Sequence, residues 1–153
     1  MTVVLTYGTY DLFHVGHLNL LRRLKQMGDK LVVGVSTDEF NLRKGKKSII
    51  NFEDRSAIVA SIKYVDLVIP EEDWAQKRSD IVKHGVHKFV MGDDWTGKFD
   101  DLGDLCEVAY LDRTQGVSSS EIKQALAVFS RERLDELVKA INTVGAIAKT
   151  LNT

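Results

Sequence analysis

The chain has 153 residues, with 21 lysines and arginines against 22 aspartates and glutamates, and 44% of its residues are hydrophobic. This length fits one compact main domain, the single cysteine (Cys106) excludes an internal disulfide, and no apolar run reaches the roughly 20 residues of a membrane span. We therefore expect a cytoplasmic protein that does not insert into membranes, and its formal net charge of −1 gives no general attraction for nucleic acid.

Short apolar strands alternate with amphipathic helical segments along the chain. The expected strands are residues 3–7, 30–36, 65–69, 88–91 and 106–111, and the expected helices begin near residues 15, 52, 74, 118 and 130. This alternation predicts a doubly wound, Rossmann-like α/β fold, with a parallel sheet of about five strands and helices on both faces. We expect a main domain over residues 1–127 and a C-terminal amphipathic helical extension over residues 128–153.

The segment after the first strand carries the most specific pattern, and ligands of such sheets bind beyond the carboxyl ends of the strands. His14 and His17 are three residues apart at the start of a helix, so they share one face of it. A helix N-terminus favours phosphate, Gly16 gives a ligand room to approach the backbone, and Thr9 offers a hydroxyl. The segment predicts a site for a nucleotide triphosphate.

A zinc site made of four histidines is the alternative, because His84 and His87 repeat the spacing of the first pair. The second pair precedes a strand, however, whereas the first pair follows one. A strand of five residues separates its two ends by roughly 17 Å, far more than a shared zinc allows. We therefore interpret His84 and His87 as ordinary turn residues.

A second candidate segment follows the last strand. The guanidinium of Arg113 can bind phosphate oxygens with two parallel hydrogen bonds. Ser118, Ser119 and Ser120 then open a helix, where hydroxyls and backbone N–H groups can hold phosphates. Ser118 also forms a capping-box pattern with Glu121, and we expect it to have both roles.

Charged residues gather after the other strands. The basic ones, Arg43, Lys44, Lys46 and Lys47, form either a solvated loop or part of the site. Arg55 either reaches phosphates or forms a salt bridge on its helix. Asp11 either holds a nucleotide-bound Mg²⁺ or caps the helix and orients a histidine. Asp38 and Asp66 either order the lysine loop or meet substrate hydroxyls, and Asp94 either accepts from a base amine or belongs to a turn.

Two of these segments resemble known signatures. Gly8-Thr9-Tyr10-Asp11 with His14-Val15-Gly16-His17 resembles the HxGH signature of the nucleotidyltransferase superfamily. Arg113-Thr114-Gln115-Gly116-Val117-Ser118 resembles the second signature of its cytidylyltransferase branch, which uses CTP. Residues 36–41 and 91–95 are similar, more narrowly, to bacterial cytidylyltransferases that act on glycerol 3-phosphate. The resemblance covers residues 1 to about 127, with mild departures at Tyr10, Gln115 and Ser119.

The resemblance implies CTP and glycerol 3-phosphate as substrates, Mg²⁺ accompanying CTP, a homodimer, and CDP-glycerol for a teichoic-acid-like or capsular polymer. It implies that His14, His17, Lys44 and Arg113 are catalytic. The substrate-binding residues are then Lys44, Lys77, Asp38 and Asp66, with any metal contact through Asp11. The nucleotide-binding residues are then Thr9, Tyr10, His14, Gly16, His17, Lys46, Asp94, Arg113, Thr114, Gly116, Ser118, Ser119 and Ser120.

Other interpretations of the function stay open. The acceptor or nucleotide can differ, as in reactions on phosphoethanolamine, phosphocholine, or a flavin or pantetheine phosphate with ATP. A cationic head group favours an aromatic or acidic box, whereas Lys44 and Lys77 suit anionic glycerol phosphate. A non-catalytic nucleotide-binding module is a further alternative.

In the C-terminal extension, apolar residues recur every seven residues, at Leu134, Ile141 and Ala148. This spacing suits either packing on the main domain or a dimer contact.

Overall fold

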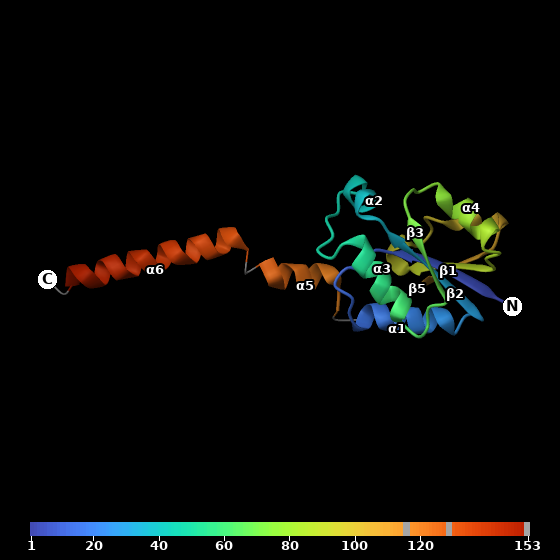
Figure 1. Ribbon diagram of the computed structural model, residues 1–153, viewed down its shortest axis with the longest axis horizontal. Coiled ribbons are helices and arrows are strands. Elements are labelled where there is room, and N and C mark those ends of the chain that lie inside the picture. Colours follow the sequence, from blue (N-terminus) through green and yellow to red (C-terminus); the bar gives the residue numbers. More distant parts are fainter. Residues whose placement is uncertain (115–116, 128–129, 152–153) are drawn as a thin grey trace. The chain divides into compact units, whose positions relative to one another are not determined.

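The protein is seen in a computed structural model that describes residues 1–114, 117–127 and 130–151. Parallel strands form one five-stranded sheet (Figure 1). Their order across the sheet is β3-β2-β1-β4-β5. Their bounds are β1 Val3–Gly8, β2 Lys30–Ser36, β3 Leu67–Glu71, β4 Lys88–Gly92 and β5 Glu107–Leu111. The doubly wound fold is confirmed, and its strand order reverses between β1 and β4, where such sheets bind ligands.

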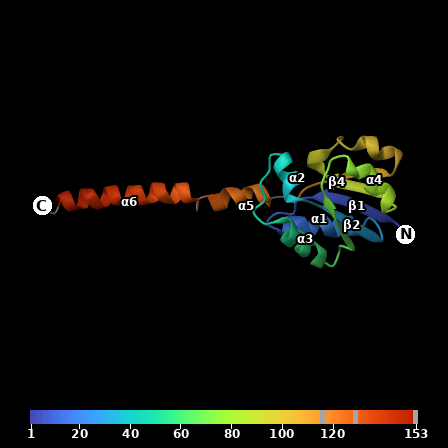
Figure 2. The same cartoon turned by 45° about the horizontal axis from the view of Figure 1, so that its top comes forward.

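Helices cover both faces of the sheet (Figures 1 and 2). On one face, α1 (Val15–Lys25) and α3 (Phe52–Ser61) bury Leu21, Leu24 and Val59 against the strands. On the other face, α4 (Gln76–Lys83) packs with the 3-10 segment Asp100–Asp104 over a second core cluster. The near-continuous apolar runs of β1 and β2 follow from this arrangement, because these strands are buried on both sides.

Two local features differ from the prediction. Strand β3 extends beyond the expected end to include Pro70 and Glu71, which is possible because an edge strand tolerates proline. A short helix, α2 (Asp38–Arg43), follows β2, where we predicted only a polar stretch. Its N-cap is Thr37, whose hydroxyl accepts the Phe40 N–H at 3.1 Å. Six residues are too few to show a helical period in the sequence.

The chain forms two compact units, Met1–Val117 and Ser118–Thr153, and each is described by itself. In the second unit, α5 (Ser119–Leu126) is capped by Ser118, which accepts the Glu121 N–H at 3.0 Å as predicted. Helix α6 (Arg131–Leu151) leaves its apolar side chains exposed. The expected boundary between a main domain over residues 1–127 and a C-terminal extension over residues 128–153 stays a prediction. Over the described ranges, no helix has the length and apolar character needed to cross a membrane.

Candidate active site

The two histidines of the first signature stack at the start of α1, with ring centroids 3.9 Å apart. His14 is the N-cap, and its Nδ1 accepts the Gly16 N–H at 3.0 Å. Nδ1 of His17 in turn accepts the backbone N–H of His14 at 3.2 Å. Because each Nδ1 acts as an acceptor, each neutral ring carries its proton on Nε2. The N-terminus of α1 therefore presents two imidazole N–H donors of assigned tautomer.

Burial keeps these rings neutral. It lowers the pKa of His17 to about 4, with a further contribution from His14 and an opposing one from Asp11, and it also lowers the pKa of His14. A Cβ on Gly16 would lie 2.8 Å from Cε1 of His14. Glycine at this position therefore makes room for the His14 ring, and the approach of a ligand to the Gly16 backbone stays a prediction. Near pH 7 the pair can donate hydrogen bonds as neutral imidazoles.

The loop before α1 is held in a strained conformation. Tyr10 and Leu12 adopt the left-handed region, with φ of 55° and 51°. The Tyr10 ring is only 5% exposed and lies in the core, 5.4 Å from the His17 ring between centroids. The ring packs inward and supports His17, so the predicted nucleotide contact of Tyr10 falls to its backbone and stays a prediction.

Asp11 fastens this loop to a distant segment. Its two carboxylate oxygens accept the backbone N–H groups of Ile49 at 2.8 Å and Ile50 at 3.0 Å. The side chain is 2% exposed. These bonds correct the interpretation of Asp11 as a metal ligand, since its oxygens organise backbone amides. Among the described residues, no group of three or more His, Cys, Asp or Glu side chains is arranged to hold a metal ion.

Arg55 links the end of β1 to the end of β2 through hydrogen bonds. Its buried guanidinium donates to the carbonyls of Thr9 and Ser36, each at 2.8 Å, and to that of Ile50. It also binds Asp38 at 2.7 Å. The interpretation in which Arg55 reaches phosphates is therefore wrong. The guanidinium fixes the ends of β1 and β2, and the segments that follow these strands carry His14 and Lys44.

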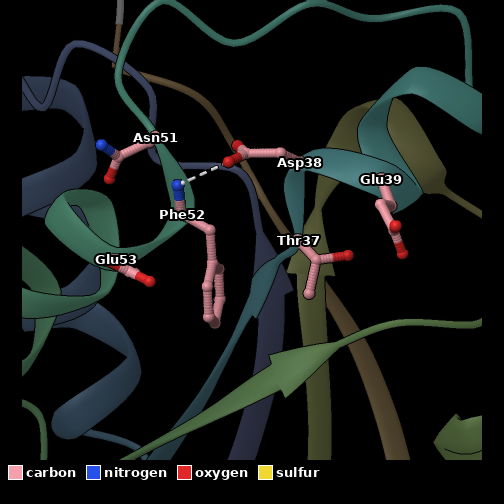
Figure 3. Close-up of a pocket in the computed structure, with 6 residues that line it drawn as sticks. All are labelled: Thr37, Asp38, Glu39, Asn51, Phe52 and Glu53. Carbon is pink, nitrogen blue, oxygen red and sulfur yellow. Dashed lines mark hydrogen bonds between the residues drawn. The ribbon is translucent and has the colours of Figure 1, made fainter.

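Asp38 orders the loop that carries the lysines. Its carboxylate accepts the Phe52 N–H at 3.0 Å (Figure 3), and this bond, with the Arg55 contact, holds the pKa of Asp38 below its usual value. A hollow of about 380 Å³ lies beside it. Its lining residues are Thr37, Asp38, Glu39, Asn51, Phe52 and Glu53 (Figure 3). Three carboxylates in that lining disfavour phosphate, so we do not place the nucleotide there.

Two lysines converge on one buried carboxylate at the end of β3. Nζ of Lys77 lies 2.8 Å from Oε2 of Glu71, and both side chains are 4% exposed. Nζ of Lys44 lies 3.9 Å from Oε1 of Glu71 and 3.3 Å from Oγ of Ser36, and its side chain is 12% exposed. Burial lowers the pKa of Lys44, and Glu71 opposes this shift. The predicted pair of Lys44 and Lys77 is therefore brought together.

Sequence reasoning missed Glu71. The available signal was its place two residues after the expected end of the third strand, at the ligand edge of the sheet. Lys46 and Arg43, by contrast, are exposed. Arg43 donates to the carbonyl of Glu72, in keeping with a surface role.

Aromatic rings enclose the buried ammonium groups. Nζ of Lys77 lies 4.7 Å from the centroid of the Tyr7 ring, 4.8 Å from that of Trp74 and 5.5 Å from that of Phe99. Nζ of Lys44 lies 5.6 Å from the same Trp74 ring. Trp74 therefore lies beside both lysine ammonium groups.

The second signature begins alongside α1. Nη1 of Arg113 lies 3.5 Å from Oδ1 of Asp94, so these two predicted residues meet in an exposed pair. Thr114 accepts a hydrogen bond from the side chain of Asn19 in α1 at 3.4 Å. Gly116 lies outside the described residues. Ser118, Ser119 and Ser120 belong to the second unit, where Ser118 caps α5.

Two sets of candidates lie at the opposite ends of the strands. Asp66 accepts the Leu31 N–H at 2.7 Å and pairs with Lys25 at 2.6 Å, near the start of β2. Its expected contact with substrate or with the lysine loop is therefore wrong. His87 accepts the Val3 N–H at 3.0 Å at the start of β1, whereas His14 follows the end of β1. The two histidine pairs thus lie at opposite ends of β1, as predicted.

Comparison with known proteins matches residues 5–125 to a family described as cytidylyltransferase-like. The chain is 58% identical over 127 residues to the glycerol-3-phosphate cytidylyltransferase of Bacillus subtilis (strain 168), covering 83% of this chain and 98% of that one. It is 58% identical over 126 residues to the enzyme of the same name from Staphylococcus aureus (strain NCTC 8325 / PS 47), covering 82% of this chain and 96% of that one.

More distant similarities agree with the fold. The chain is 36% identical over 121 residues to the ethanolamine-phosphate cytidylyltransferase of Mus musculus, covering 75% of this chain and 30% of that one. A crystal structure of the lipopolysaccharide core biosynthesis protein from Thermoplasma volcanium GSS1 superimposes with a TM-score of 0.65 at 24% identity. It covers 75% of this chain and 99% of that chain, and at this identity it supports the fold alone.

Proposed function

The chain belongs to the cytidylyltransferase-like family, and we propose from this premise that it converts CTP and glycerol 3-phosphate into CDP-glycerol and pyrophosphate. The observation that carries the chemistry is the stacked pair His14 and His17, whose Nε2–H groups are set at the N-terminus of α1. The acceptor is supported by the similarity to two glycerol-3-phosphate cytidylyltransferases over most of the chain.

In the proposed reaction, a phosphate oxygen of glycerol 3-phosphate attacks the α-phosphorus of CTP in line. The new P–O bond forms as the bond from the α-phosphorus to the bridging oxygen breaks, and pyrophosphate leaves with that electron pair. A dianionic phosphate needs no general base for this attack. Catalysis is then positioning and neutralisation of charge.

The histidines serve as donors to the oxygens of the transferring phosphate, where negative charge develops. Arg113 neutralises the leaving pyrophosphate, and Lys44 holds the acceptor phosphate. The proposed nucleotide contacts, beyond the histidines and Arg113, are Thr9, the Tyr10 backbone, Gly16, Lys46, Asp94, Thr114, Gly116, Ser118, Ser119 and Ser120. Neutral imidazoles suit this task, because each ring already carries a proton on Nε2 with which to donate a hydrogen bond. Neither ring has to take a proton from the acceptor substrate.

Mg²⁺ is proposed to arrive bound to CTP and to neutralise part of the triphosphate charge. The Asp11 carboxylate does not fit as its ligand, because it accepts the backbone N–H groups of Ile49 and Ile50. The triphosphate oxygens and water are therefore the proposed ligands.

We propose further that the protein is a cytoplasmic homodimer whose CDP-glycerol supplies a teichoic-acid-like or capsular polymer. The exposed apolar side chains of α6, among them Leu134 and Ile141, support a contact between copies. Removing residues 128–153 and measuring the mass in solution tests this role. A dimer that persists would place the contact on the main domain, and a monomer would place it on the extension.

The test of the activity is pyrophosphate release by the purified chain with CTP or ATP and each acceptor. The acceptors are glycerol 3-phosphate, phosphoethanolamine, phosphocholine, a flavin phosphate and a pantetheine phosphate. Rapid release is expected with CTP and glycerol 3-phosphate alone. If pyrophosphate is released only with another pair, the proposed acceptor or nucleotide is wrong and that pair takes its place. If no pair gives release, a non-catalytic nucleotide-binding module is favoured.

A further inference from the structure

The ammonium group of Lys77 is bound inside the protein as an ammonium ligand would be. One carboxylate and three aromatic rings surround it: Oε2 of Glu71 at 2.8 Å, and the rings of Tyr7, Trp74 and Phe99 with centroids within 5.5 Å. We name these four residues the cation box. A carboxylate combined with aromatic faces is the environment that recognises organic ammonium groups. Here the occupant is the chain's own side chain.

The cation box adjoins the proposed acceptor site. Lys44, which holds the acceptor phosphate in our proposal, shares Glu71 and Trp74 with Lys77. Trp74 is 47% exposed, so one wall of the box also faces solvent. The acceptor's head group, attached to a phosphate at Lys44, is therefore presented beside the box.

Lys77 also saturates the carboxylate of the box. Oε2 of Glu71 binds Lys77, and Oε1 accepts the hydroxyl of Ser36 at 2.6 Å. An external ammonium at this place would meet the charge of Lys77 and that of Lys44, whose Nζ lies 3.9 Å from Oε1, without a carboxylate left to balance it. Like charges in a buried setting repel strongly. A neutral glycerol group carries no such penalty.

We infer that Lys77 determines acceptor specificity, because its ammonium fills a cation box that would otherwise accept a cationic head group. This inference rests on the proposed function and deepens it. It makes Lys77 an excluding residue, whose effect is to reject acceptors such as phosphoethanolamine. It predicts that shortening Lys77 opens the box to an external ammonium.

The experiment compares the wild-type chain with Lys77→Ala and with the double variant Glu71→Gln/Lys77→Ala. The double variant is the matched control, since it empties the same space but removes the carboxylate. The first readout is the melting temperature as a function of the n-butylammonium concentration. This ion reproduces the lysine side chain, and sodium chloride at the same concentrations is the ionic-strength control. The second is kcat/KM with CTP for phosphoethanolamine and for glycerol 3-phosphate.

For Lys77→Ala we expect a saturable rise of the melting temperature with n-butylammonium, and no such rise for the wild type or the double variant. We also expect the phosphoethanolamine-to-glycerol-3-phosphate ratio to rise about tenfold or more in Lys77→Ala alone, as befits one desolvated cation contact. If Lys77→Ala folds only in the presence of n-butylammonium, that rescue supports the box equally.

The inference is overturned if n-butylammonium neither stabilises nor rescues Lys77→Ala, or if the acceptor ratio stays unchanged. Equal responses of the single and double variants would also overturn it, because Glu71 would then play no part. Failure of the proposed function is distinguishable: a wild-type chain inactive on glycerol 3-phosphate would overturn the activity, while the melting experiment would still judge the box.

Discussion

The two ends of the parallel strands carry the same kinds of residues in different surroundings. At the carboxyl end, His14 and His17 stack at a helix N-terminus, and the Lys77–Glu71 ion pair is buried. At the amino end, His84 and His87 repeat the histidine spacing, and Lys25 pairs with Asp66 at 2.6 Å in a partly exposed place. Residue type and spacing therefore do not distinguish the two ends, whereas position on the sheet does.

The largest contrast is expected between the two histidine pairs. His17→Ala removes a proposed donor to the transferring phosphate and is expected to lower kcat by about 10²- to 10³-fold. His84→Ala, at the other end of the strands, is expected to leave kcat within about twofold. Steady-state pyrophosphate release, with circular dichroism as a check of folding, measures both. Equal losses in the two variants would break the comparison.

The two ion pairs offer a comparison in stability. Lys77→Met removes the ammonium 2.8 Å from the buried Glu71 carboxylate and leaves only Lys44, at 3.9 Å. We expect it to lower the free energy of unfolding by about 3–5 kcal/mol. Lys25→Met removes an ion pair whose side chains are 29% and 40% exposed, and we expect a loss of about 1 kcal/mol or less. Urea denaturation of both variants measures this. A larger loss for Lys25→Met would contradict the account.

An effect smaller than the loss of the Lys77–Glu71 pair is the acid dependence of stability that His17 adds. Its pKa is about 4 in the folded chain and about 6.5 when unfolded, so below pH 6.5 the unfolded state binds the proton first. Stability therefore falls as the pH drops from about 6.5 to about 4, by of the order of 2 to 3 kcal/mol from this residue. His17→Asn lacks the titrating group, so urea midpoints across this range should fall less steeply. Parallel profiles for the two proteins would contradict the buried neutral ring.

The sequence predicted features that depend on spacing along the chain. The bounds of β2, the cap at Ser118 and the convergence of His14 with His17 were all found where expected. The partners of charged side chains were harder to predict, because they come from segments distant in sequence. Asp11 binds amides near residue 50, for example, and Asp66 binds the start of β2.

Glu71 and Tyr10 illustrate the same limit. A lone glutamate after a strand gives no sign that two lysines will share it, and only the packed sheet brings Lys44 and Lys77 to its oxygens. Tyr10 stands inside a signature motif, yet its left-handed backbone turns the ring into the core. Burial and long-range hydrogen bonds, which have no period in the sequence, decided these roles.

The central claim is that the phosphate of glycerol 3-phosphate attacks the α-phosphorus of CTP. Glycerol 3-phosphate labelled with ¹⁸O at its non-ester phosphate oxygens tests this directly, with the products followed by ³¹P NMR and mass spectrometry. We predict that all of the label stays in CDP-glycerol, including its bridging oxygen, and that pyrophosphate carries none. Label in pyrophosphate, or release of CMP in place of pyrophosphate, would contradict the account.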